Sequence, residues 1–235
     1  MRFIVTDLTR FQKPEIVCIA GIEPKTTRCV RPMPYLKSDM CKKLKILPGA
    51  ILDGDLQTPA KTEKPHIEDM EYKGLRFHGP CSPEEFRKVL IDTTYNSISE
   101  GFNHTLPEES KVIPAETPPD RSIITLNIDP SQLEIVRDGY DSKKIKLHLT
   151  DNDGRRYRFL PITDLGFYNL AISKEAEPNY TDDLNLFISS QEEVYLRIGL
   201  SRKFEHTDGR KGFWVQVNGI YTFPEFMTDV RTYKV

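Results

Sequence analysis

Cationic and aromatic side chains are interleaved along the chain between residues 193 and 221. Aromatic rings on a sheet can stack on nucleic-acid bases, neighbouring cations can neutralise phosphates, and amide side chains can read base edges. The competing interpretation is that Phe213, Val215 and Val217 form the buried face of a strand and that Trp214 is core. The first interpretation predicts a binding surface made of Arg197, Arg202, Lys203, Trp214, Gln216, Asn218 and Tyr221.

A second basic feature lies near the start of the chain, where Arg28 and Arg31 flank a short apolar pair ahead of Pro32. The residue before a proline is restricted to extended backbone, so the Arg31 side chain can project into a cleft. Alternatively, Arg31 is held in an ion pair with Asp53 or Asp55. The first reading adds Arg28 and Arg31 to the predicted binding surface.

The formal net charge is -2, so the whole protein has no overall attraction for a polyanion. Lys and Arg nevertheless outnumber Asp and Glu at both ends of the chain, and the acidic excess lies in the middle. The basic segments can gather into one face of a nearly neutral protein. The alternative is that solvated loops carry them.

One cluster has residue types suited to catalysis or metal binding, His66, Glu68 and Asp69. An imidazole and two carboxylates can ligate a metal or transfer protons. The alternative is a polar loop, because no second cluster supplies further ligands at a recognisable spacing. His206 is expected at an exposed loop tip. No phosphate-binding loop, dinucleotide fingerprint, nucleophile elbow or zinc-protease motif is present. The sequence therefore leaves enzyme activity open but favours a protein that is not an enzyme, and we expect no cofactor and no metal.

The four cysteines, Cys18, Cys29, Cys41 and Cys81, include no C-x-x-C pair. This spacing is typical neither of a structural zinc site nor of a disulfide framework, so we expect reduced thiols. No apolar run approaches the roughly 20 residues that span a bilayer, and the N-terminus lacks the apolar region of a signal peptide. These features predict a cytoplasmic protein with no membrane partner.

Short runs of β-branched and aromatic residues, bounded by proline and polar residues, predict that strands position these side chains. The expected strands include 16–22, 50–56, 122–128, 144–149, 156–160, 194–200 and 213–217. Ser82, Pro83 and Glu85 are a helix start signal, and two further short helices are expected over 164–173 and 181–190. The predicted fold class is mainly β with a few short helices.

Residues 103–120 are rich in proline and acidic residues and have little apolar periodicity, which is typical of a linker or a long surface loop. We therefore predict an N-terminal module over 1–104, a linker or long loop over 105–120, and a C-terminal module over 121–235.

Several short motifs resemble those of a known family. IVCIAGIE at 16–23 is followed by RCVRP at 28–32, and the chain later carries GAILD at 49–53, PHIED at 65–69, LRIGLSR at 196–202 and WVQVNGIY at 214–221. In these motifs the chain resembles the dual OB-fold-containing domain family of prokaryotic proteins. The resemblance implies two OB-like β-barrel modules on either side of the 103–120 segment.

OB barrels bind single-stranded nucleic acids across an exposed strand face. The resemblance therefore implies RNA or single-stranded DNA as the ligand rather than catalysis, with Arg31, Arg202, Trp214, Gln216 and Asn218 as candidate contacts. Together with the residue pattern, it predicts a non-enzymatic nucleic-acid-binding module, the sensor part of a larger system, with a protein partner as a further expectation.

Each predicted contact has a chemical role. Phosphate contact is assigned to Arg28, Arg31, Arg197, Arg202 and Lys203, stacking to Trp214 and Tyr221, and base-edge contact to Gln216 and Asn218. The alternatives are an enzyme with a site near His66, Glu68 and Asp69, or a protein-interaction scaffold.

Overall fold

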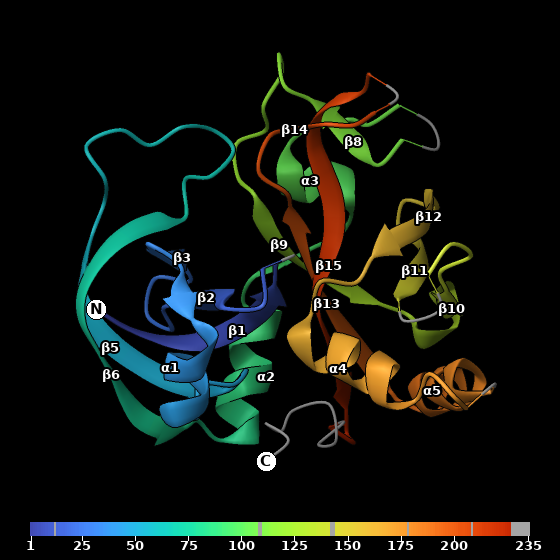
Figure 1. The fold of residues 1–235 in the computed structure, drawn as a ribbon, viewed down its shortest axis with the longest axis horizontal. Coiled ribbons are helices and arrows are strands. Elements are labelled where there is room, and N and C mark those ends of the chain that lie inside the picture. Colours follow the sequence, from blue (N-terminus) through green and yellow to red (C-terminus); the bar gives the residue numbers. More distant parts are fainter. Residues whose placement is uncertain (12, 108–109, 142–143, 178, 208, 227–235) are drawn as a thin grey trace.

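The structure is a computed structural model, and it describes residues 1–226 apart from 12, 108–109, 142–143, 178 and 208. The chain is mainly β with short helices, and two groups of strands lie side by side (Figure 1). No helix within the described residues combines the length and the apolar character needed to cross a bilayer.

The first group of strands is a closed five-stranded barrel. Its members are β1 (Arg2–Arg10), β2 (Ile16–Ile22), β3 (Cys29–Met33), β5 (Ala50–Gln57) and β6 (Asp69–Pro80). The pairing runs β1-β2-β3-β6-β5 and returns to β1, with β3 and β6 parallel and the other pairs antiparallel. The short β4 (Leu36–Lys37) and α1 (Ser38–Lys43) connect the third and fourth barrel strands. This is the small Greek-key barrel of an OB fold.

The second group repeats this order. Its first strand is β9 (Ile123–Ile128), continued through the 3-10 turn η1 (Pro130–Gln132) into β10 (Leu133–Arg137). The strands that follow are β11 (Ile145–Thr150), β12 (Arg156–Pro161), β13 (Glu193–Leu200) and β15 (Lys211–Phe223). β9 pairs with β13 and β10 pairs with β11, and a parallel bridge from Ile162 to Val217 connects the end of β12 to β15. Helices α4 (Leu165–Ser173) and α5 (Tyr180–Ser189) lie between the third and fourth barrel strands, as α1 does in the first barrel.

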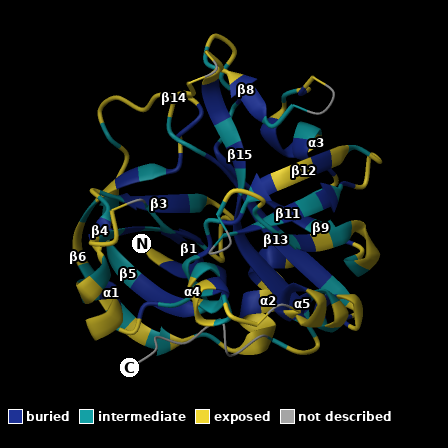
Figure 2. Cartoon of the chain, turned by 45° about the vertical axis from the view of Figure 1, so that its right-hand side comes forward, coloured by how far each residue is buried: buried dark blue, intermediate teal, exposed yellow. Residues whose placement is uncertain are grey.

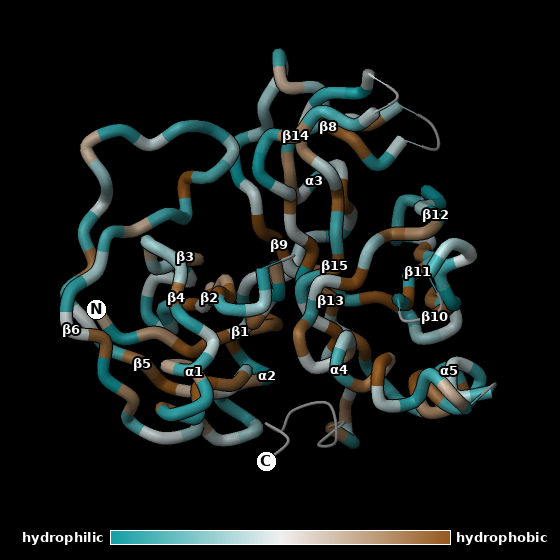
Figure 3. Tube along the Cα trace, in the orientation of Figure 1, coloured by the Kyte–Doolittle hydropathy of each residue, from teal (hydrophilic) through white to brown (hydrophobic). Residues whose placement is uncertain are grey.

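Each barrel has its own apolar core, and a third cluster lies between the two. β1 contributes both to the core of the first barrel and to the cluster between the barrels, because Phe3 and Val5 point into the first barrel while Ile4 faces the other way. Helix α2 (Pro83–Ile91) supplies Phe86 and Leu90 to the cluster between the barrels. Burial and apolar character both concentrate on the strands that meet there (Figures 2 and 3).

Backbone hydrogen bonds also join the two barrels. The amide of Arg10 donates to the carbonyl of Thr163 over 3.0 Å, and Thr9 forms a β-bridge with Asp164. The loop between β5 and β6 crosses to the second half (Figure 1), where Lys64 Nζ lies 2.6 Å from Asp120. The barrels are therefore joined by contacts at several places, and not only by the chain segment that connects them.

Several sequence-based expectations about elements are confirmed. The helix predicted from Ser82 is α2, with the expected capping box, and the two later helices are α4 and α5. The segment 103–120 was expected to be a loop throughout, and this is wrong at β8 (Val112–Pro114), which pairs with β15. The strand β10 and the two-residue β14 (Phe204–Glu205) were not predicted.

The division into modules 1–104 and 121–235 stays a prediction. Within the predicted first module, β7 (Thr94–Tyr95) pairs in parallel with β9 of the second barrel. Helix α3 (Ile98–Phe102) likewise contributes Ile98 and Phe102 to the second core. We propose that the second structural unit begins near β7, so that β8 and the rest of the described part of 105–120 belong to it rather than to a linker.

Candidate functional site

A buried ion pair connects the two barrels. Arg197 on β13 donates through Nε to Asp7 on β1 over 2.9 Å, and each side chain is 1% exposed. Arg197 also donates to Thr125 over 2.7 Å, and Asn218 donates to the other Asp7 oxygen over 3.2 Å. Burial by itself lowers the pKa of Arg197, but the adjacent Asp7 carboxylate outweighs burial and raises that pKa, so Arg197 stays charged.

A second interface network brings together the basic residues from the two chain ends. Arg31 and Arg202 both donate to Asp69, over 2.6 Å and 2.8 Å, and Arg202 also donates to the Tyr35 hydroxyl over 2.8 Å. The predicted convergence of Arg31 and Arg202 therefore occurs, but the two guanidinium groups share the Asp69 carboxylate, which balances one of their two charges. The expected alternative partners of Arg31, Asp53 or Asp55, are wrong, because parallel pairing of β3 with β6 places Asp69 opposite Arg31.

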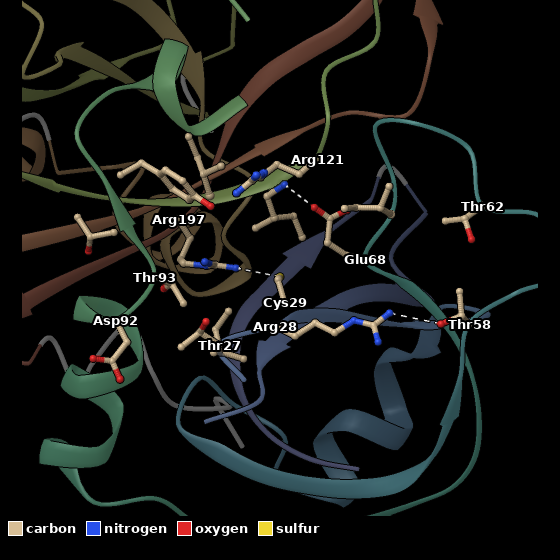
Figure 4. Close-up of a pocket in the computed structure, with 16 residues that line it drawn as sticks. Thr27, Arg28, Cys29, Thr58, Thr62, Glu68, Asp92, Thr93, Arg121 and Arg197 are labelled. Carbon is tan, nitrogen blue, oxygen red and sulfur yellow. Dashed lines mark hydrogen bonds between the residues drawn. The ribbon is translucent and has the colours of Figure 1, made fainter. Parts of the chain in front are cut away.

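The first barrel opens onto a cavity of about 610 Å³ that lies between the barrels, here called the inter-barrel cavity. One wall is the turn from β2 to β3 together with the β5–β6 loop, including Thr27, Arg28 and Thr58. The opposite wall is the segment around β7 and the start of β9, including Tyr95 and Arg121 (Figure 4). Strands 2 and 3 and the loop between strands 4 and 5 are the parts of an OB barrel that hold oligomeric ligands.

Two arginines on opposite walls give this cavity its accessible positive charge. Arg28 is exposed, and it extends along the cavity and donates to Thr58 over 3.3 Å (Figure 4). Arg121 is half-buried, with its guanidinium 4.9 Å from the centre of the Tyr95 ring. In the described part of the chain neither guanidinium has a carboxylate partner. The cavity therefore combines two available cations with an aromatic ring.

The carboxylates and the third arginine of the cavity are already engaged. Glu68 is buried and accepts hydrogen bonds from the Ser122 amide over 2.7 Å and the Ser122 hydroxyl over 2.8 Å. Asp92 is paired with Lys88 over 2.7 Å on α2. Arg197 is held by Asp7, so its charge is internally balanced.

The residues predicted on the C-terminal strand lie mostly inside the interface. Tyr221 is fully buried and donates to the Thr6 carbonyl over 2.6 Å, and Gln216 donates to Asn218 over 3.1 Å. Trp214 is half-buried, and the Arg210 guanidinium lies 4.9 Å from its ring. Lys203 is exposed. Of the nine predicted contacts, Arg28 is the accessible cation that lines the inter-barrel cavity, and Arg197 lines it as a paired residue.

The cluster of His66, Glu68 and Asp69 is divided among three separate contacts. His66 packs edge-on against Phe213, Glu68 holds the start of β9, and Asp69 pairs with Arg31. Burial, and then the charges of Arg31 and Arg202, lower the pKa of His66 to about 3. No group of three or more His, Cys, Asp or Glu side chains within the described residues is arranged to hold a metal ion. His206 is exposed, as expected.

The cysteines are free thiols, as the spacing predicted. Burial raises the pKa of Cys29 to about 12 and that of Cys18 to about 11. Because the thiolate is the reactive form, these groups are poor nucleophiles. Cys29 Sγ instead accepts a hydrogen bond from Arg197 over 3.4 Å.

Sequence reasoning missed Tyr95 and Arg121. Tyr95 lies in a two-residue strand that is too short to show an alternating sequence pattern. Only the parallel pairing of this strand with β9 brings Tyr95 near Arg121. One signal was available for Arg121, a cation that lies two residues before the strongly apolar strand β9.

Two barrels with the same strand order define a tandem OB protein. The family model for the Dual OB-containing domain matches residues 1–220, and the chain belongs to this family. A search of curated proteins and a search of solved structures each found no match.

Proposed function

We propose that this protein binds single-stranded nucleic acid, RNA or DNA, in the inter-barrel cavity and that its role is binding rather than catalysis. The observation that carries the proposal is the position of Arg28 and Arg121 on opposite walls of a cavity that faces the ligand-binding strands of an OB barrel. Arg28 and Arg121 contact the phosphates, and the Tyr95 ring offers a face for a base.

The contact set differs from the predicted one for a physical reason. A phosphate cannot reach Arg197 or Tyr221 while their polar atoms bond protein groups inside the interface. Arg31 and Asn218 are buried and held in the same way, by Asp69 and Asp7. The Arg202 side chain is 40% exposed, but its guanidinium is engaged by Asp69 and Tyr35. We therefore assign these residues to joining the barrels and give the ligand contacts to the cavity walls.

We also propose a cytoplasmic location. The support is that all four thiols are free, the usual state of cysteines in a reducing compartment.

The test is fluorescence anisotropy with labelled mixed-sequence RNA and DNA single strands. Wild-type affinity is expected to fall with rising salt, with a slope of log K against log [salt] of about -0.7 for each phosphate contacted. Arg28→Glu and Arg121→Glu are each expected to weaken binding. Lys43→Glu is the matched control, because it makes the same charge change on α1, away from the cavity.

Two outcomes would overturn the proposal. The first is the absence of salt-sensitive binding of wild-type protein at micromolar concentration to any RNA or DNA pool. The second is an equal loss of affinity in Lys43→Glu and in the two cavity variants, which would mean that only total charge matters.

A further inference from the structure

The second barrel carries a basic cavity of its own, about 830 Å³ in volume, beside the start of β12. We call it the β12 cavity. Its described lining includes four cations and one exposed aromatic ring: Lys111, Arg155, Arg156, Arg158 and Phe159. None of its lining residues lines the inter-barrel cavity.

The charge of this cavity is largely unbalanced. Arg156 and Arg158 are exposed, and neither guanidinium has a carboxylate partner in the part of the chain that the structure describes. Asp153 is the one carboxylate among the described lining residues. Burial lowers the pKa of Lys111, and the nearby charges of Lys146 and Arg210 lower it further. Like charges held this close favour an anionic ligand.

Arg155 is fixed at the edge of the cavity. Its Nη2 donates to the Leu106 carbonyl, and its backbone amide donates to Asp151 over 3.0 Å. Its Nε is buried without a hydrogen-bond partner among the described residues. An unsatisfied buried donor is uncommon in native proteins, so this guanidinium retains an unused hydrogen-bonding capacity.

A β-bulge aims Phe159 outward. The register of β11 and β12 shifts between Leu147 and Leu149, so that Arg158 and Phe159 together oppose His148. Phe159 has φ 55°, a left-handed conformation that a bulky residue adopts at a cost. Regular alternation would bury its ring beside that of Tyr157, whereas the bulge leaves Phe159 47% exposed. Bulges that re-aim a side chain are frequent next to functional sites.

The two cavities flank one short segment of chain. Tyr95 lines the inter-barrel cavity, and Ser99, four residues further on, lines the β12 cavity. Four residues span at most about 14 Å even when fully extended. Between them, Asn96 donates to Asp153 on the rim of the β12 cavity over 2.9 Å. Site sizes of about 4–16 nucleotides per OB fold are long enough to cover this interval.

We propose that a single strand bound in the inter-barrel cavity continues over the β7–α3 segment to the β12 bulge. There Arg156 and Arg158 contact its phosphates, and the Phe159 ring stacks on a base. This inference rests on the proposed function and extends it, because it assigns the bound strand a path from the first barrel to the second.

The test compares a 4-nucleotide with a 16-nucleotide single strand, by anisotropy for wild type, Phe159→Ala and the double variant Arg156→Glu/Arg158→Glu. The 16-mer is expected to lose affinity by about tenfold or more in Phe159→Ala, the scale of one base–aromatic stack. In the double variant its salt slope is expected to become shallower by about 1.4, for two lost phosphate contacts. The 4-mer is expected to bind all three proteins equally, and the double variant Lys42→Glu/Lys43→Glu on α1 is the control matched in charge to Arg156→Glu/Arg158→Glu.

The outcomes separate this inference from the function on which it rests. If wild type binds neither oligonucleotide, both are overturned. If wild type binds both and neither β12 variant weakens the 16-mer, the extended path alone is overturned. Equal losses for the 4-mer and the 16-mer would also overturn it, since the β12 residues would then be acting on the inter-barrel cavity. Arg156 and Arg158 are exposed, so the double variant keeps the test decisive if Phe159→Ala perturbs the bulge.

Discussion

Asp7 of β1 and Arg197 of β13, 190 residues apart in the chain, form an ion pair that is almost completely sealed between the two barrels. Thr125 and Asn218 complete its hydrogen bonding from the second barrel. A buried pair of this kind is costly to break, because removing one partner leaves an unbalanced charge in a site that is almost closed to solvent. The relative position of the barrels, and with it the shape of the inter-barrel cavity, therefore depends on this contact.

Asp7→Ala is expected to destabilise the protein by about 3–5 kcal/mol, since it strands the Arg197 guanidinium in the interface. The measurement is the urea unfolding curve at neutral pH. Asp7→Ala/Arg197→Met is expected to be more stable than Asp7→Ala, because the apolar replacement removes the unbalanced charge. Arg76→Ala breaks an exposed pair with Asp53 and is expected to cost at most about 1 kcal/mol. A double variant no more stable than Asp7→Ala would contradict this account.

His66 is expected to make stability depend on pH between about 6.5 and 3. Burial, and then Arg31 and Arg202, lower its pKa to about 3, so the folded protein keeps His66 neutral where the unfolded chain takes up a proton. A lowered pKa means that stability is complete above the unfolded value and is lost as the pH falls. The loss from this one residue is about 2 kcal/mol between pH 8 and pH 5.

The substitution His66→Leu tests this directly. Neither ring nitrogen has a hydrogen-bond partner among the described residues, so little change is expected at pH 8. At pH 5 the variant is expected to be more stable than wild type, as measured by urea unfolding at both pH values. Parallel losses of stability in wild type and His66→Leu between pH 8 and pH 5 would rule out a titrating role for this histidine.

Asp69 is expected to make the stability of the fold depend on pH in a lower range than His66 does. Burial by itself raises the pKa of its carboxyl, but hydrogen bonds from Arg202 and the charge of Arg31 outweigh burial and lower that pKa. The stabilisation is then present above the unfolded value of about 3.9 and is lost as the pH falls below it. Asp69→Asn is expected to be less stable than wild type at pH 7 and to approach wild type near pH 3.

Glu63→Gln is the matched control for Asp69→Asn. Glu63 is an exposed carboxylate in the β5–β6 loop, which ends where Asp69 begins β6. Glu63→Gln is expected to leave the midpoint of urea unfolding unchanged at pH 7 and at pH 3. If the difference between wild type and Asp69→Asn were as large at pH 3 as at pH 7, the carboxylate charge would not be the source of the stabilisation.

Features set by local sequence could be predicted, and features set by strand register could not. The capping box of α2 involves two residues three apart, and Ser82 and Glu85 satisfy each other's amides as expected. Both barrels were expected because short motifs at the two chain ends resemble one family, and the strand order agrees. By contrast, β8 was read as loop because its three residues form a strand only by pairing with β15.

The candidate site shows the same limit. The alternation of side chains along a strand indicates which face a given side chain occupies, but it does not indicate which strand lies opposite. The sequence therefore allowed a pair between Arg31 and Asp53, whereas strand register places Asp69 opposite Arg31 and Arg76 opposite Asp53. The basic character of the chain ends was correctly identified, but much of it is used to hold the barrels together.

The last prediction decides between two aromatic residues as the base-stacking group. Tyr95 lines the inter-barrel cavity beneath Arg121, whereas Trp214 lines neither that cavity nor the β12 cavity and packs against Arg210. Tyr95→Leu is expected to weaken binding of a 16-nucleotide strand by about 1–3 kcal/mol, and Tyr95→Phe, which keeps the ring face, by much less. Trp214→Leu is expected to leave affinity nearly unchanged, and anisotropy at constant salt measures all three. The opposite ranking, with Trp214→Leu defective and Tyr95→Leu normal, would move the ligand to the C-terminal strand. The inter-barrel cavity would then have no role in binding.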